Sequence, residues 1–210
     1  MTEAFRERVR LRFAKRGDAR FLSHHDLMRA WEMALRRSGL PVKMTEGFNP
    51  RIRLSMPLAL GLGIASEDEI LEIELEGWTP AEEIRAKLAP QLPPGIELKD
   101  LDLVAPGQRG QVDWVEYGVR LSDTDGEKLK ALLEHPAVVV ERVKEEERKT
   151  LDIRPYLMEV RREGAEDWRM RLRVTPAGTA RPDEPLKAIG IEVSRAAALL
   201  TKLRTQMTAG

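Results

Sequence analysis

Apolar and polar positions alternate along several short segments in the first half of the chain. Residues 9–13 alternate valine, leucine and phenylalanine with arginine, and residues 69–75 place leucine and isoleucine on one face and glutamate on the other. A period of two is typical of a strand with one buried face. Further strands are expected at 51–56, where Pro57 favours an edge position, and at 96–104.

Two segments between these strands carry helical patterns. The first follows Ser23, which with Asp26 resembles a capping box, and a Gly–Leu–Pro run ends it. Its apolar positions fall on one stripe: Leu27, Ala30, Trp31, Ala34 and Leu35. The second begins with Thr79 as N-cap and Pro80 as the first helical residue, and runs to about Leu92. The order strand–helix–strand–strand–helix–strand predicts a ferredoxin-like sandwich, with both helices on one face of a sheet.

The second half repeats this pattern less regularly. Strands are expected at 114–121, 138–143, 157–162 and 168–174, and helices at 125–134 and 182–189. The tail, 193–205, favours a helix by its alanine and leucine content, whereas closing a second unit requires a strand there. We therefore expect an α+β protein of tandem ferredoxin-like (βαββαβ) sandwiches, the second one irregular. The two domains are expected at 1–104 and 111–210, joined by a turn-rich linker at 105–110.

The composition limits the chemistry that the chain can perform. Its 210 residues are 42% hydrophobic and 33% charged, which is enough apolar material for folded cores. The absence of cysteine excludes disulfides, thiolate metal sites, iron–sulfur ligation and cysteine nucleophiles. No segment is apolar enough to span a membrane and the charged N-terminus is no signal peptide, so we expect a soluble, cytoplasmic protein. There is also no phosphate-binding or dinucleotide-binding motif and no serine nucleophile elbow, and we expect no cofactor.

The net charge of zero conceals blocks of opposite sign. Residues 1–53 carry 13 Lys/Arg and 6 Asp/Glu, whereas residues 54–104 carry 3 and 11. In a ferredoxin-like sheet the first and third strands are neighbours, so one interpretation pairs the arginines at 8, 10 and 12 with Glu72 and Glu74. The other interpretation is an RNA-type binding face, although its outward positions lack the aromatic rings that stack on bases.

Basic residues also gather around the first helix, away from these acidic strands. They precede the helix or lie on its exposed side: Lys15, Arg16, Arg20, Arg29, Arg36 and Arg37. A helix N-terminus offers free N–H groups and a favourable dipole to a phosphate. The loop 46–51 adds Phe48 as a stacking ring and Arg51 as another cation, a combination that suits single-stranded nucleic acid. The alternative is a solvated turn with Phe48 packed into the core.

His24 and His25 are weak catalytic candidates. Adjacent helical residues point about 100° apart, so the two do not readily share one metal ion. The third histidine, His135, belongs to the other expected domain. A metal site is therefore not expected. If either residue of the pair is chemically active, a general base in RNA cleavage is the role that fits.

Several runs of the sequence together resemble the radical-SAM-linked family of uncharacterised bacterial proteins. They are residues 10–17 (Arg-Leu-Arg-Phe-Ala-Lys-Arg-Gly), 20–29 (Arg-Phe-Leu-Ser-His-His-Asp-Leu-Met-Arg), 36–41, 46–50 (Glu-Gly-Phe-Asn-Pro), 58–63, 66–69, 151–155 and 179–183. Members of this family occur beside a radical SAM enzyme or fused to one. The resemblance implies an accessory that presents a substrate to that enzyme. Because the chain has no cysteine, it does not itself carry the three-cysteine cluster motif of a radical SAM enzyme. The doubled pattern is also similar in architecture to CRISPR repeat-processing endoribonucleases, a likeness that transfers no catalytic residue.

These observations lead to three hypotheses. The first is a non-catalytic accessory that binds RNA, or an RNA-containing substrate, for a partner radical SAM enzyme. Its expected contact surface is Arg20, Ser23, His24, Arg29, Phe48, Asn49 and Arg51. The second is a metal-independent endoribonuclease with His24 or His25 as the base, and the third is a module that only docks on the radical enzyme.

Overall fold

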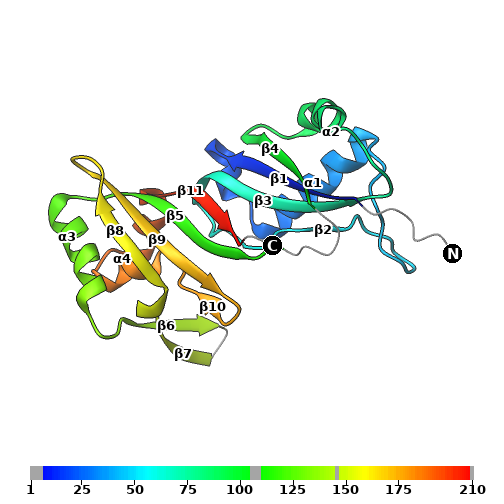
Figure 1. Ribbon diagram of the computed structural model, residues 1–210. Coiled ribbons are helices and arrows are strands. Elements are labelled where there is room, and N and C mark those ends of the chain that lie inside the picture. Colours follow the sequence, from blue (N-terminus) through cyan, green and yellow to red (C-terminus); the bar gives the residue numbers. More distant parts are fainter. Residues whose placement is uncertain (1–6, 105–109, 145–146, 209–210) are drawn as a thin grey trace. The chain divides into compact units, whose positions relative to one another are not determined.

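The computed structural model describes residues 7–104, 110–144 and 147–208. It is a mixed α+β structure in which the paired strands are antiparallel (Figure 1). The chain divides into two compact units, one up to Gln111 and one over Val112–Thr208. Except for Gly110, the linker expected at 105–110 lies outside the described residues.

Unit 1 is a four-stranded sheet with two helices on one face. Its elements are β1 (Glu7–Lys15), the 3-10 turn η1 (Gly17–Phe21), α1 (His24–Ser38), β2 (Leu54–Ser55), β3 (Ala65–Leu75), α2 (Ala81–Leu88), the 3-10 turn η2 (Ala89–Gln91) and β4 (Ile96–Val104). The strand order is β4-β1-β3-β2. The apolar side of β1 and β3 packs against α1 and α2, and the Trp31 ring meets Phe13 edge-on at 4.8 Å between centroids. The opposite, open side of the sheet carries the charged residues.

Helix α1 confirms the sequence pattern at both ends. The Ser23 hydroxyl accepts a hydrogen bond of 3.2 Å from the Asp26 N–H, as an N-cap does. Gly39 ends the helix in the left-handed region, at φ 67°, where a side chain would be strained. The buried residues Leu27, Trp31, Ala34 and Leu35 belong to the predicted stripe. The outer face of the helix is thereby left for other contacts.

Two predictions about unit 1 were wrong in detail. Helix α2 begins at Ala81 with Pro80, not Thr79, in the N-cap position, because Thr79 is buried and its N–H donates to Glu7 Oε2 at 2.9 Å. The helix ends at Leu88 and continues only as a 3-10 turn. The strand expected at 51–56 is only the two residues of β2, at the edge of the sheet before Pro57.

In unit 2 four strands pair in the order β8-β9-β5-β11, and a short β10 pairs with β9. Its elements are β5 (Val112–Arg120), α3 (Asp123–Ala131), η3 (Leu132–Glu134), β6 (Val139–Lys144), β7 (Glu147–Asp152), η4 (Arg154–Tyr156), β8 (Leu157–Arg162), β9 (Asp167–Thr175), β10 (Gly178–Thr179), α4 (Glu184–Ala188), α5 (Val193–Leu199) and β11 (Leu200–Met207). Helix α3 comes so close to β9 that a Cβ on Gly126 would lie 1.9 Å from Trp168. The Trp168 side of β9 is therefore the side that faces the helix.

The structure also settles the ambiguous segments of unit 2. The tail is helix α5 followed directly by strand β11, so both of its opposing sequence signals are realised, one after the other. Strand β7, which was not predicted, pairs with β6 in a separate two-stranded sheet. Asp152 Oδ1 accepts hydrogen bonds from the backbone N–H groups of Val138 and Arg154, at 2.8 and 3.0 Å.

Within the described ranges, no helix is long and apolar enough to cross a membrane. The same residues contain no group of three histidine or acidic side chains arranged to hold a metal ion.

Candidate functional site

A hollow of about 850 Å³ lies between the outer face of α1 and the loop before β2. Its lining residues come from these two segments alone: His25, Met28, Arg29, Glu32, Arg36, Asn49, Pro50 and Arg51. Three of them, Arg29, Asn49 and Arg51, belong to the contact surface predicted from the sequence. The structure thus brings the helix and loop parts of that prediction together around one space.

Helix α1 supplies its part through residues spaced three or four apart. His25, Arg29, Glu32 and Arg36 follow one another at intervals of four, three and four residues, which places them on one side of an α-helix. The other side of α1 is held in the core by Trp31 and its apolar neighbours. Burial of one face therefore fixes which side chains the helix presents to the hollow.

The loop is fastened at both of its ends. The Thr45 hydroxyl accepts a 2.9 Å hydrogen bond from the Arg51 N–H, and the Thr45 N–H donates to the Arg51 carbonyl at 2.7 Å. Just outside this pair, Met44 and Ile52 form an antiparallel bridge, and Ile52 is buried. The backbone of Arg51 is therefore fixed, while its side chain is exposed beside the hollow.

The charges around the hollow are unbalanced. Among the described residues, the guanidinium groups of Arg29, Arg36 and Arg51 have no ion-pair or hydrogen-bond partner. A single carboxylate, Glu32, lies between Arg29 and Arg36 along the helix, and it also makes no ion pair with a described residue. Three cations against one anion in one concave site favour an anionic ligand.

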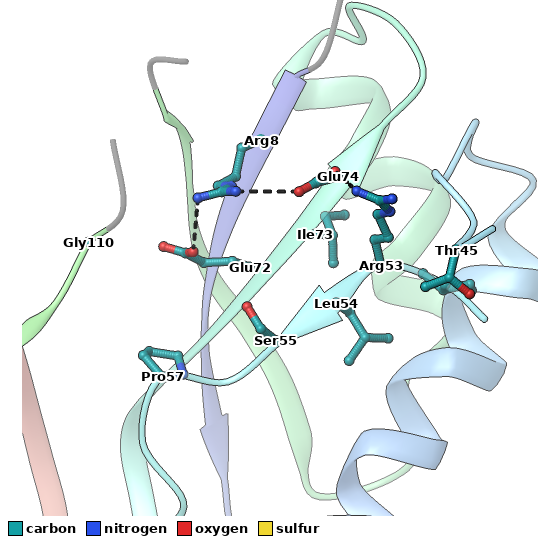
Figure 2. Close-up of a pocket in the computed structure, with 11 residues that line it drawn as sticks. Arg8, Thr45, Arg53, Leu54, Ser55, Pro57, Glu72, Ile73, Glu74 and Gly110 are labelled. Carbon is teal, nitrogen blue, oxygen red and sulfur yellow. Dashed lines mark hydrogen bonds and ion pairs between the residues drawn. The ribbon is translucent and has the colours of Figure 1, made fainter. Parts of the chain in front are cut away.

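A second hollow, of about 490 Å³, lies on the open side of unit 1 and has the opposite character (Figure 2). Here the cations are already paired: Arg8 contacts Glu74 at 3.3 Å and Glu72 at 3.9 Å, and Arg53 contacts Glu74 at 3.6 Å. Arg10 adds a 2.8 Å contact to Glu72. These pairs favour the interpretation in which the first and third strands cancel each other's charge, except that Arg12 pairs with Asp68 at 2.8 Å and not with Glu72 or Glu74.

The start of α1 is largely occupied by its own contacts. The Ser23 hydroxyl donates to Asp26 Oδ2 at 2.7 Å as well as capping the helix, so the carboxylate of Asp26 already lies at the positive end of the helix. His24 Nδ1 is buried with no hydrogen-bond partner among the described residues. Neither Ser23 nor His24 lines the hollow between α1 and the loop, whereas His25 does.

Two of the three cations that precede α1, Lys15 and Arg16, are engaged in other contacts. Lys15 is buried and its ammonium donates to the Arg20 carbonyl at 3.4 Å, while the Arg20 guanidinium lies 4.6 Å from the centre of the Phe21 ring. Arg16 is paired with Glu67 and Glu97. Its hydrogen bond is the main reason that the pKa of Glu67 is lowered from its ordinary value. Lys15 and Arg16 are therefore engaged, whereas Arg20 has no acidic partner among the described residues and its charge adds to those beside the hollow.

Phe48 is fully exposed, with a relative accessibility of 106%. The alternative that it packs into the core is therefore wrong. Phe48 itself does not line the hollow, but its chain neighbour Asn49 does. An exposed ring next to unpaired cations is the combination found on single-strand binding surfaces.

Comparison with known protein families gives a match over most of the chain. Residues 8–182 match a family described as an uncharacterised protein conserved in bacteria (DUF2344). The chain belongs to this family. The matched region contains every residue that lines the hollow of this DUF2344 protein, together with most of unit 2. No match was found among curated proteins.

Sequence reasoning left five lining residues of this DUF2344 chain outside its contact surface: His25, Met28, Glu32, Arg36 and Pro50. Three of the helical ones were accessible from periodicity, because His25, Glu32 and Arg36 lie four, three and seven residues from Arg29 and so share its side of the helix. Pro50 follows from its place between Asn49 and Arg51. For Glu32, the helical spacing is the only feature of the sequence that indicates a place in the lining of the hollow.

Proposed function

We propose that this chain is a non-catalytic accessory protein that binds single-stranded RNA, or an RNA-containing substrate, in the hollow between α1 and the loop 46–51. The observation that carries the proposal is the set of three guanidinium groups, Arg29, Arg36 and Arg51, with no acidic partner among the described residues. Guanidinium groups bind phosphate through two parallel N–H donors, so a phosphodiester backbone fits them.

The surroundings of these arginines favour a single strand over a duplex. Asn49 supplies an amide that both donates and accepts hydrogen bonds at the rim of the hollow, which suits the edge of an unpaired base. Phe48, exposed on the same loop, offers a ring on which a base can stack. Both contacts require bases that are not already paired in a helix.

The partner that we propose is a radical SAM enzyme, as the family resemblance implies. In this role the accessory holds the RNA while the enzyme, which carries the cluster, performs the chemistry. We test this part by copurification of tagged protein with the enzyme after nuclease treatment. Association that persists without RNA supports a direct partnership, and loss of association argues against it.

We also propose that both units are ferredoxin-like sandwiches. In unit 1 the order β4-β1-β3-β2 corresponds to fourth, first, third and second strand of a βαββαβ unit. In unit 2 the order β11-β5-β9-β8 has the same form if β6, β7 and β10 are treated as additions. Solution of an experimental structure tests this assignment, which a different strand order would overturn.

Binding of single-stranded RNA is tested by filter binding with an oligouridylate of roughly 12 nucleotides. Wild-type protein is compared with Arg29→Gln/Arg51→Gln and with Glu32→Gln at about 50 mM salt. Loss of two phosphate contacts weakens binding by about ten-fold or more, whereas removal of the carboxylate strengthens it. Opposite shifts from neighbouring positions would not arise from a general loss of folding.

Two outcomes would overturn the proposal. The first is that wild-type protein retains no RNA even at low salt. The second is cleavage of the same RNA during incubation in EDTA, detected by gel analysis, because the proposed role is non-catalytic. Cleavage that is abolished in His25→Ala or His24→Ala would favour the endoribonuclease instead.

A further inference from the structure

Trp114 lies on the open side of the sheet in unit 2. Along β5, Val115, Tyr117 and Val119 are buried and pair with Leu172, Met170 and Trp168 of β9, on the side that faces α3. Since side chains alternate along a strand, Trp114 points to the opposite side. It is partly exposed there, and β5 lies between β9 and β11.

Arginines from both neighbouring strands surround the Trp114 ring. The guanidinium carbon of Arg171 lies 4.2 Å from the ring centre, and that of Arg204 lies 5.5 Å from it. Arg173 is the direct cross-strand partner of Trp114 on β9, and Gln206 is its partner on β11. An indole ring on a middle strand is thus flanked by three cations and an amide.

These cations differ in how far they are already engaged. Arg171 is held by Glu116 at 3.0 Å and by Glu159 at 3.3 Å, which fixes its guanidinium over the ring. Arg204 donates to the Gln206 amide oxygen at 3.3 Å, a neutral partner. Arg173 is exposed and has no ion pair or hydrogen bond from its side chain within the described ranges. Two positive charges beside the aromatic ring, on Arg173 and Arg204, therefore have no acidic partner in the part of the chain that the structure describes.

We infer that the open side of unit 2 carries a second contact for single-stranded RNA, centred on Trp114. A base stacks on the Trp114–Arg171 layer, because both the indole and the guanidinium plane accept a stacked base. Arg173 and Arg204 bind the flanking phosphates. This inference rests on the proposed function for the identity of the ligand, but it concerns different residues in a different unit.

The Trp114 contact concerns unit 2 alone, and it predicts a response of the indole ring to RNA. A purely structural role for the Trp114–Arg171 contact predicts no response of the ring to RNA.

Tryptophan emission reports on this contact directly. Trp31 and Trp168 are buried, and Trp78→Phe removes the exposed Trp78, which leaves Trp114 as the partly exposed tryptophan. Titration of this variant with an oligouridylate of roughly 12 nucleotides quenches its emission, and Trp114→Phe in the same background abolishes the quenching. Filter binding is measured in parallel. Arg173→Gln is expected to weaken RNA binding about five-fold, whereas the control Arg120→Gln, at an exposed position on β5, is expected to leave it unchanged.

The outcomes separate this inference from the proposed function. Quenching that persists at lower affinity in Arg29→Gln/Arg51→Gln supports a contact independent of the hollow. RNA binding without quenching, or equal affinities for Arg173→Gln and Arg120→Gln, overturns the Trp114 contact and leaves the hollow in place. Absence of all RNA binding overturns both, and quenching by an acidic peptide but not by RNA reassigns the surface to a protein ligand.

Discussion

The Arg10 guanidinium lies against the Glu72 carboxylate, with Nη2 and Nε at 2.8 and 3.1 Å from the same oxygen, Oε1. The two residues face each other across β1 and β3 in register. Both side chains are largely buried, with 14% and 11% of their surface exposed. The pair shows that much of the positive charge of the N-terminal segment is balanced within the sheet, and it directs attention to the cations that have no such partner.

Glu72→Gln is expected to lower the free energy of unfolding by about 2 kcal/mol, because it leaves the largely buried Arg10 without its counter-charge. Urea unfolding measures the change. Glu83→Gln, which breaks an exposed pair with Lys87 on α2, is the control and changes stability little. RNA affinity is expected to be the same in both variants, and a loss of affinity in Glu72→Gln alone would mean that the open side of unit 1 takes part in binding.

Arg36→Gln is expected to weaken RNA binding about five-fold, because Arg36 lines the hollow with its guanidinium unpaired among the described residues. Arg37 is the matched control. It follows on the same helix but donates to the Gln91 carbonyl at 2.9 Å, outside the hollow. Filter binding of Arg36→Gln and Arg37→Gln distinguishes a site from a diffuse effect of helix charge, which would weaken both equally.

Phe48→Ala is expected to leave thermal stability unchanged, because the side chain is fully exposed and buries nothing in the fold. Its effect on RNA is expected to be about a ten-fold loss of affinity, the magnitude of one stacked base. Phe48→Trp should retain affinity, since it keeps an aromatic surface. Equal weakening by both substitutions would show that the loop conformation, and not stacking, depends on Phe48.

The pH dependence of stability is expected to include the pair formed by Arg16 and Glu67. The hydrogen bond from Arg16 lowers the pKa of Glu67, so the folded protein binds fewer protons at this group than the unfolded chain does. This stabilisation is present at neutral pH and is lost as the pH falls through the lowered pKa. Thermal unfolding between about pH 7 and about pH 3 should show a smaller drop in Tm for Glu67→Gln than for wild type. If Glu67→Gln drops by as much as wild type, the pair does not contribute.

The elements with strong periodicity could be predicted from the sequence. The regular alternation of arginine in β1 and glutamate in β3 made their pairing one of two interpretations, and the apolar stripe of α1 indicated its buried face. Strand β7 was not predictable from periodicity, because its residues Glu147–Asp152 are mostly exposed and show no apolar alternation. The tail was ambiguous for a physical reason, since Val193–Met207 contains a helix and a strand in succession.

The candidate site was predictable in position but not in detail. Charge clustering indicated Arg29 and Arg51 and the loop 46–51 added Asn49, and these three residues border one hollow. The expectation of a phosphate at the start of α1 did not allow for Asp26, whose carboxylate and N–H both contact Ser23. Whether a charged side chain is already paired depends on residues distant in sequence, such as Glu67 and Glu97 for Arg16, and periodicity does not report this.

The salt dependence of RNA affinity tests the central claim most directly. Filter binding is measured from about 50 to about 200 mM KCl for wild type and for Arg29→Gln/Arg36→Gln/Arg51→Gln. Each phosphate contact contributes about 0.7 to the slope of log affinity against log salt for a single strand, so the triple variant should have a slope shallower by about 2. Parallel lines for the two proteins would mean that these arginines do not contact the backbone, and would contradict the hollow as the RNA site.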